Sequence, residues 1–157
     1  MTHRIRLRRP WTREIFRDGQ SLHRADRVDV PDVAEGNEVL TPEVLRAERG
    51  NGDATPTEYH AIYQRHFNCP TGLEDDDQVS IEIAPAPSQS FVVRLNDEVI
   101  GSSDQDDREE GDRDVVQLPV PKPLVGQNQL EIELRSKVAS SLPRCVAEVA
   151  LRIDAAS

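Results

Sequence analysis

The sequence predicts an all-β protein, built as an antiparallel β-sandwich. Short segments alternate apolar with polar residues, which is the period of strands with one buried face. Turns rich in proline and glycine separate these segments. The sequence lacks the alternation of strands with helices that is typical of a parallel sheet. The 11 prolines also argue against a helical bundle, because proline blocks helix interiors. We expect residues 1–157 to form a single domain.

The clearest predicted element is a β-hairpin over residues 91–101. Its first strand has alternate apolar residues, namely Phe91, Val93 and Leu95. Asn96 and Asp97 follow, and both residue types tolerate the positive φ of a tight turn. The return strand ends at Gly101. A two-residue turn between two short strands is therefore expected.

The other strands are expected to lie around this hairpin. They are predicted over residues 3–8, 11–16, 27–31, 58–69, 79–83, 115–120, 130–135 and 145–153. The predicted core consists of Ile5, Leu7, Val79, Ile81, Phe91, Val93, Leu95, Leu130, Ile132, Leu134, Val149, Leu151 and Ile153. Burying such a side chain stabilises the fold by roughly 1.5–3 kcal/mol.

Two segments break the regular spacing of the strands. Residues 32–57 are predicted to be a long insertion with one short helix, because Thr41 suits the N-cap and Pro42 suits the first helical position. Residues 102–114 are almost wholly polar and are predicted to be an exposed loop. We expect a function to lie on these two segments rather than on the hairpin.

The charge of the chain excludes some partners. The net charge of −10 argues against nucleic acid and anionic membranes, which bind clustered lysine and arginine. Arginines between His3 and Arg13 form a basic edge that could bind an anion, but pairing with the protein's own acidic residues is favoured. No apolar stretch approaches the ~20 residues of a membrane span, and no signal peptide is present. The sequence as written predicts a cytoplasmic protein.

The two cysteines, Cys69 and Cys145, are too few for a disulfide framework. Each lies at the end of a predicted strand, so antiparallel pairing of those strands would bring the thiols together. Two reduced, buried thiols are the other interpretation. The sequence leaves both open.

No constellation of residues predicts catalysis. The histidines, at positions 3, 23, 60 and 66, lack the spacing of a zinc site. Glu131 and Glu133 share a strand face that is expected to be solvated. No cofactor is predicted, although Asp104, Asp106 and Asp107 could offer calcium its preferred carboxylate oxygens. Acidic runs are more often simply solvated.

Sugar binding requires an aromatic surface beside polar groups, since the apolar face of a sugar stacks on a ring. The candidates are Trp11 and the pair Tyr59 and His60, which follows the long insertion. Aromatic residues make up only 4% of the chain, which argues against a strong carbohydrate-binding module.

Five segments, taken in order, resemble a known family. They are Arg6-Leu7 to Trp11, Val28 to Pro31, Tyr63 to Phe67, Val93 to Gly101 and Gly126 to Ile132. Together they resemble the N-terminal sugar-binding-like domain of family-two glycoside hydrolases, a jelly roll of the galactose-binding-like type. Asp97 stands where that family usually has glycine. The family's catalytic carboxylates lie in another domain, so the resemblance implies a fold and sugar binding but no hydrolase activity.

These observations predict a non-catalytic β-sandwich that binds a ligand or partner, with carbohydrate as the first class to test. The alternative is a structural or protein-interaction module without a small-molecule ligand. The sequence leaves open the identity of the ligand, the oligomeric state and whether the chain is a fragment of a larger protein.

Overall fold

The computed structural model describes residues 1–32, 58–86, 89–103, 115–121, 123–136, 142–145 and 147–156. Within these ranges the chain forms strands and no α-helix. The strands are β1 (Thr2–Arg6), β2 (Trp11–Arg17), β3 (Gln20–Val28), β4 (Tyr59–Asn68), β5 (Gln78–Ile83), β6 (Gln89–Leu95), β7 (Glu98–Ser102), β8 (Val116–Pro119), β9 (Gln127–Ser136) and β10 (Ala150–Asp154).

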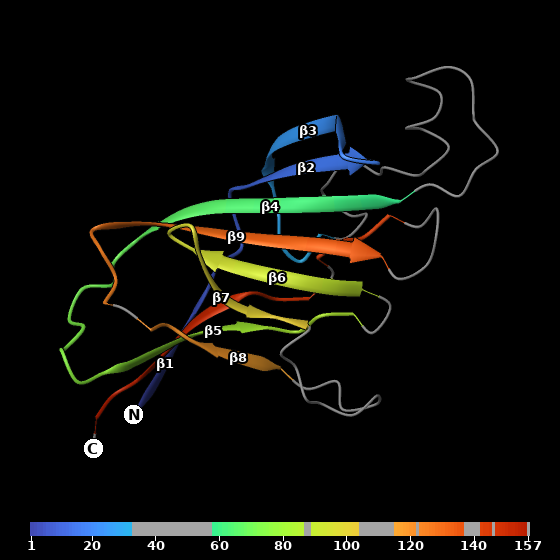
Figure 1. Ribbon diagram of the computed structural model, residues 1–157. Coiled ribbons are helices and arrows are strands. Elements are labelled where there is room, and N and C mark those ends of the chain that lie inside the picture. Colours follow the sequence, from blue (N-terminus) through green and yellow to red (C-terminus); the bar gives the residue numbers. More distant parts are fainter. Residues whose placement is uncertain are drawn as a thin grey trace, which may run out of the picture.

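The strands form two antiparallel sheets that face each other (Figure 1). One sheet has the order β1-β10-β5-β8, and the other has the order β3-β2-β4-β9-β6-β7. The predicted β-sandwich is therefore confirmed. The predicted short helix at residues 41–47, like most of the insertion, lies outside the described residues.

The core lies between the two sheets and is filled by alternate residues of their strands. The large aliphatic side chains at its centre come from strands of both sheets and are each no more than 1% exposed, as are Ile81, Val93, Leu130, Ile132 and Leu151. The period-two pattern of the sequence predicted this inward face because successive side chains of a strand point to opposite sides. The polar residues between them form the outer faces of the sandwich.

The predicted hairpin is formed by β6 and β7, with Asn96 and Asp97 at its turn. Their φ angles of 52° and 68° are those of a type I′ turn, which matches the twist of paired strands. The amide of Asn96 donates to Oδ1 of Asn128 at 3.1 Å, and its Oδ1 accepts from the backbone N–H of Gln129 at 2.9 Å. The turn is thereby fastened to the start of β9.

Three expectations were wrong in detail. Ile5 is 41% exposed rather than buried, because β1 is the outermost strand of its sheet and borders an open cavity. The strand predicted over 27–31 is instead β3, which begins at Gln20. As the last strand of its sheet, β3 has a mostly polar sequence without clear alternation. The final strand, β10, begins at Ala150 and not at Cys145.

The first and last strands lie side by side. The pairing of β1 with β10 runs from Thr2 opposite Asp154 to Arg6 opposite Ala150. The backbone N–H of Ala155 donates to the carbonyl of Met1 at 3.1 Å. The two ends marked in Figure 1 are accordingly close together.

Candidate functional site

The side of the six-stranded sheet that faces away from the core carries a regular array of side chains, here named the outer grid. Its rows cross β2, β4, β9 and β6, because the pairing registers of these strands place the residues opposite one another. The first row is Phe16, His60, Arg135 and Ser90; the second is Glu14, Ile62, Glu133 and Val92; the third is Thr12, Gln64, Glu131 and Arg94. Neighbouring strands lie about 4.8 Å apart, so the grid is about 14 Å wide.

Hydrogen bonds connect the polar side chains of the grid. Gln64 Nε2 donates to Glu131 Oε1 at 2.9 Å. Arg94 Nη1 lies 3.2 Å from Glu131 Oε2 and 3.3 Å from Glu133 Oε2. Arg135 Nη2 donates to Glu133 Oε1 at 3.1 Å. These contacts fix the positions of the carboxylates while leaving their side chains partly exposed.

An aromatic pair occupies one corner of the grid. The rings of Phe16 and His60 are stacked, with centroids 4.5 Å apart and planes inclined by 3°. Burial lowers the pKa of His60, and the nearby Arg135 guanidinium lowers it further against the opposing effect of Glu133 and Glu58. The neutral imidazole is therefore favoured. The pair thus places a half-buried phenyl ring, stacked on an imidazole that is only 9% exposed, beside charged hydrogen-bonding groups.

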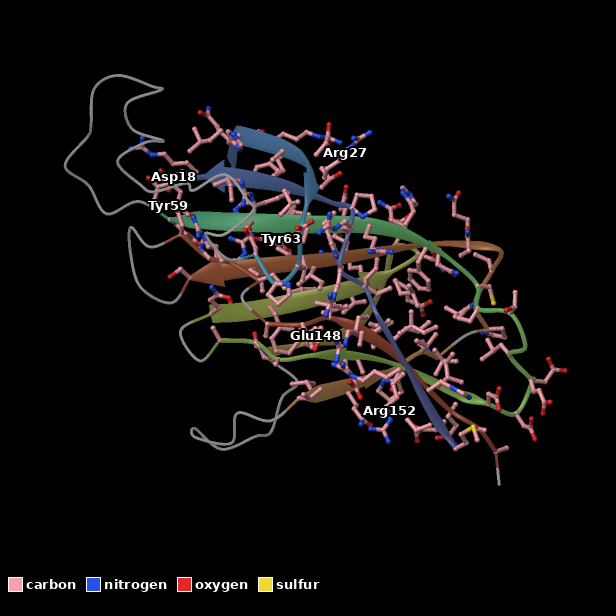
Figure 2. The ribbon with its side chains drawn as sticks, turned by 180° about the vertical axis from the view of Figure 1, so that it is seen from behind. Asp18, Arg27, Tyr59, Tyr63, Glu148 and Arg152 are labelled. Atoms are coloured by element: carbon pink, nitrogen blue, oxygen red, sulfur yellow. The ribbon has the colours of Figure 1, made fainter. Side chains whose placement is uncertain are left out.

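The structure separates the three residues that the sequence put forward for ligand binding. His60 lies on the outer grid, whereas Trp11 and Tyr59 point into the core and are each 1% exposed. The indole N–H of Trp11 donates to the carbonyl of Leu7 at 2.7 Å. Tyr59 lies at the start of β4, as labelled in Figure 2. A ligand contact of Trp11 or Tyr59 stays a prediction.

The calcium ligands predicted at Asp104, Asp106 and Asp107 lie outside the described residues. Within the described ranges, Glu74, Asp76 and Asp77 can bring one carboxylate oxygen each within 4.8 Å of one another. Oxygen ligands of this kind suit calcium. Asp77 Oδ2 already accepts from the backbone N–H of Glu74 at 2.9 Å, so this cluster also holds the turn before β5.

The outer face of the four-stranded sheet carries a second group of charges. Glu82 is 5% exposed, and its Oε2 lies 2.6 Å from Nε of Arg4. Its Oε1 lies 3.4 Å from Nη1 of Arg152, and Arg4 also pairs with Glu148 at 3.4 Å. Figure 2 labels Glu148 and Arg152 at this sheet. Arg4 pairs with the protein's own acids, as the favoured interpretation of the basic N-terminal edge predicts.

A buried polar cluster behind the outer grid joins β2 and β4 to the segments that contain Asp32 and Cys145. Oδ2 of Asp32 accepts hydrogen bonds from Arg13 Nη1 at 2.7 Å and from the hydroxyl of Tyr63 at 2.5 Å. The Tyr63 hydroxyl in turn accepts from the backbone N–H of Cys145 at 3.3 Å. Burial raises the pKa of Tyr63, and the Asp32 carboxylate raises it further. Tyr63 is 0% exposed, so this cluster holds the fold together and is out of reach of a ligand.

Two adjoining cavities lie beside β1 and the end of β4. The first, of about 380 Å³, is lined by Ile5, Leu7, Arg65, His66, Phe67, Asn68, Pro70, Gln127 and Leu151. The second, of about 430 Å³, shares Ile5 and Pro70 with it and reaches Glu74 and Asp77. Each is within the range of ligand pockets, roughly 300–1,000 Å³.

Sequence reasoning identified only part of the outer grid. It placed Glu131 and Glu133 on one strand face and selected His60, but it did not select Phe16 or Arg94. The missing information was the register between strands, which decides that residues far apart in the chain become neighbours. The polar positions of β9 were the available signal, since this strand alternates clearly, whereas β4 does not.

A protein-family model matches the second half of the chain. The family model described as "Cellulose synthase BcsB, first CBM domain" matches residues 76–155. These residues run from the turn before β5 to just beyond β10, and they include β6 and β9 of the outer grid. The matching model is that of a carbohydrate-binding module and not of a catalytic domain. The search of curated proteins produced no match.

Several solved structures share the fold. An FMN-binding β-glucuronidase from Facaelibacterium prausnitzii L2-6 has a TM-score of 0.63 at 19% identity, over 98% of this chain and 22% of its own. A β-glucuronidase of an uncultured Clostridium sp. has a TM-score of 0.59 at 16% identity, over 97% of this chain and 29% of its own. A putative β-galactosidase from Bacteroides fragilis has a TM-score of 0.53 at 10% identity, over 97% and 23%.

These likenesses confirm the predicted resemblance to the sugar-binding-like domain of glycoside hydrolases at the level of the fold. The chain spans less than a third of each of these enzymes. Among the described residues, no helix is long and apolar enough to cross a bilayer. The cytoplasmic location stays a prediction.

Proposed function

The chain belongs to the family of the first CBM domain of cellulose synthase BcsB, and from this membership we propose that it is a non-catalytic module that binds a glycan on the outer grid. We further propose that residues 1–157 act as one domain. The observation that carries the proposal is the stacked pair of Phe16 and His60 beside the hydrogen-bonded row of Gln64, Glu131 and Arg94.

The chemistry of the grid suits a sugar. Carboxylates and guanidinium groups form charge-assisted hydrogen bonds, which are about twice as strong as neutral ones, and adjacent hydroxyls of a sugar can use both kinds of partner. The ring surface at Phe16 suits the apolar face of a pyranose. Because the sheet already fixes Arg94 and Glu131, binding costs little further ordering of these side chains.

The glycan class to test first is a β-glucan chain, since the matching family is named for cellulose synthase. An open sheet face suits an extended polysaccharide better than an enclosed pocket does. The width of about 14 Å gives room for more than one sugar ring along the rows. The glycan would therefore lie across β2, β4, β9 and β6.

Titration calorimetry and NMR with soluble cello-oligosaccharides, together with sedimentation with insoluble cellulose, test the proposal. We expect saturable binding, with shift changes at the backbone amides of β4 and β9. Arg94→Gln and Phe16→Leu should each weaken binding at least tenfold. Arg152→Gln, on the opposite sheet, removes an arginine that is as exposed as Arg94 and also pairs with two carboxylates, and it should leave binding unchanged.

Shift changes confined to other surfaces would contradict the proposed location of the site. Absence of binding to a broad glycan panel, by a protein shown to be folded, would contradict carbohydrate binding itself. A protein partner that competes for Arg94 and Phe16 would instead support the interaction-module alternative.

A further inference from the structure

Arg65 lies on the opposite side of β4 from the outer grid, and its charge is not balanced by the described part of the protein. Its Nη1 donates to the carbonyl of Arg9 at 2.6 Å. Its Nε is buried without a hydrogen-bond partner, and none of the described carboxylates forms an ion pair with Arg65. Burial also lowers the pKa of this guanidinium. A partly buried cation without a counter-ion is costly, unless a ligand supplies the opposite charge.

The cavity at Arg65 is free of acidic side chains, although the chain as a whole has a net charge of −10. Arg65 is the basic residue whose side chain lies on the cavity side of β4, whereas the register of β4 and β9 puts His66, Asn68 and Gln127 at the rim, on the side of the outer grid. The cavity of about 380 Å³ therefore offers a positive charge with no competing carboxylate. This environment is complementary to a small anion.

The walls of the cavity are apolar. Leu7, Phe67 and Leu151 are buried beneath it, while Ile5 leaves 41% of its surface exposed at its border. A free phosphate would gain little from such walls, whereas the carbon face of a sugar ring can pack against them. The neighbouring cavity contains Glu74 and Asp77, which can accept hydrogen bonds from hydroxyls, and the Arg4 that also lines it is already paired with Glu82 and Glu148.

We propose that this cavity binds a sugar acid of the uronate type, with its single carboxylate on Arg65 and its ring against Ile5 and Phe67. The inference goes beyond the proposed glycan site, because it concerns another surface and an anionic ligand. The N–H groups of a guanidinium pair well with the two oxygens of a carboxylate.

Binding of three small probes to the full chain tests this site. Methyl β-glucuronide and methyl β-glucoside have the same ring but differ in the carboxylate, and acetate has the carboxylate alone. We expect the glucuronide to bind at least tenfold more tightly than either of the other two, and to weaken as salt is raised. If methyl β-glucoside or acetate bound as tightly as methyl β-glucuronide, the proposal would be overturned.

Two variants assign the binding to the cavity. Arg65→Gln should reduce glucuronide affinity at least tenfold. Ile5→Glu changes an exposed residue, so it should fold, and its new carboxylate should repel the ligand, whereas the matched Ile5→Gln should bind nearly normally. Equal binding by Ile5→Glu and Ile5→Gln would overturn the assignment, even if Arg65→Gln failed to fold.

The two proposals fail separately. Arg94→Gln should bind glucuronide as the unmodified protein does, and Ile5→Glu should bind cello-oligosaccharides normally. If the unmodified protein and the variants bind glucuronide but none of them binds a glucan, only the outer-grid proposal is contradicted. If they bind glucans but none of them binds glucuronide, only the cavity proposal is contradicted.

Discussion

Arg13 and Asp32 form an ion pair that is almost completely buried, with Nη1 and Oδ2 2.7 Å apart and each side chain 1% exposed. The pair joins β2 to the segment that follows β3. Asp32 also accepts from Tyr63 of β4, and its backbone N–H donates to the carbonyl of Cys145 at 2.7 Å. Through its carboxylate and its backbone N–H, Asp32 therefore ties together four segments that are distant in sequence.

Asp32→Asn should be strongly destabilising. It removes the charge that balances the buried guanidinium, and breaking a buried pair in this way typically costs about 3–5 kcal/mol. Guanidinium chloride unfolding measures the loss of free energy. Asp29→Asn is the matched control, because the pair of Asp29 with Arg9 is exposed and should contribute at most about 1 kcal/mol. Equal losses in the two variants would refute the structural role of Asp32.

His60 should make stability depend on pH in the acid range. Because burial lowers its pKa in the folded state, the unfolded chain binds the proton more readily below the ordinary value of 6.5. The free energy of unfolding should therefore fall as pH decreases from 6.5 through the folded pKa. Urea unfolding at a series of pH values should show a smaller decrease for His60→Gln. The control is His66→Gln, at an exposed position of the same strand.

The thiol of Cys145 should be resistant to alkylation. The structure has both cysteines free, and Cys145 Sγ lies 3.7 Å from the carbonyl oxygen of Ala147. Burial of the thiol, and secondarily the charge of Asp32, raises its pKa from 9.0 to about 12. In a Cys69→Ser variant at pH 8, iodoacetamide should therefore react slowly with the folded protein and rapidly in denaturant. Equal rates in both conditions would contradict this environment.

The same thiol should weaken the fold in alkaline solution. Below pH 9 the thiol is protonated in both the folded and the unfolded state, so the free energy of unfolding does not depend on its titration. Between pH 9 and about 12 the unfolded chain loses the proton while the folded chain keeps it, so the free energy of unfolding should fall. Unfolding of Cys145→Ala over this range should show a shallower decrease.

Gly101 should resist substitution because the sheets approach closely there. A Cβ at this position would lie 2.4 Å from Cδ2 of Leu118. Gly101→Ala should therefore cost about 1–3 kcal/mol by overpacking. The cost should largely disappear in the background of Leu118→Ala, which a double-mutant cycle measures. Gly126→Ala is the control, since nothing lies within 4 Å of the added Cβ.

The sequence predicted the fold where strands have one buried and one exposed face. Residues of β9 such as Leu130 and Ile132 alternate with glutamates, and this pattern fixes both the strand and its inward side. It failed at the margins of the sandwich. Ile5 has the pattern of an inward residue, yet no strand of the other sheet covers it, and its position at the border of the sheet is set by topology alone.

The candidate sites were harder to predict than the fold because they depend on register and on compensating charges. The pairing of Phe16 with His60 joins residues 44 positions apart, and nothing local in the sequence specifies it. Arg65 lies in a segment that resembles a family motif, but its sequence neighbours do not reveal that a carboxylate partner is missing among the described residues. Such an imbalance is visible only in three dimensions.

The pairing of β1 with β10 has a consequence for engineering. Because Met1 and Ala155 are joined by a backbone hydrogen bond, the two ends of the sandwich could be connected by a short linker and the chain opened elsewhere. For the same reason, the whole sandwich could be spliced into a surface loop of a host protein while disturbing the host little. Its outer grid, on the other sheet, would project from the host as an accessory surface.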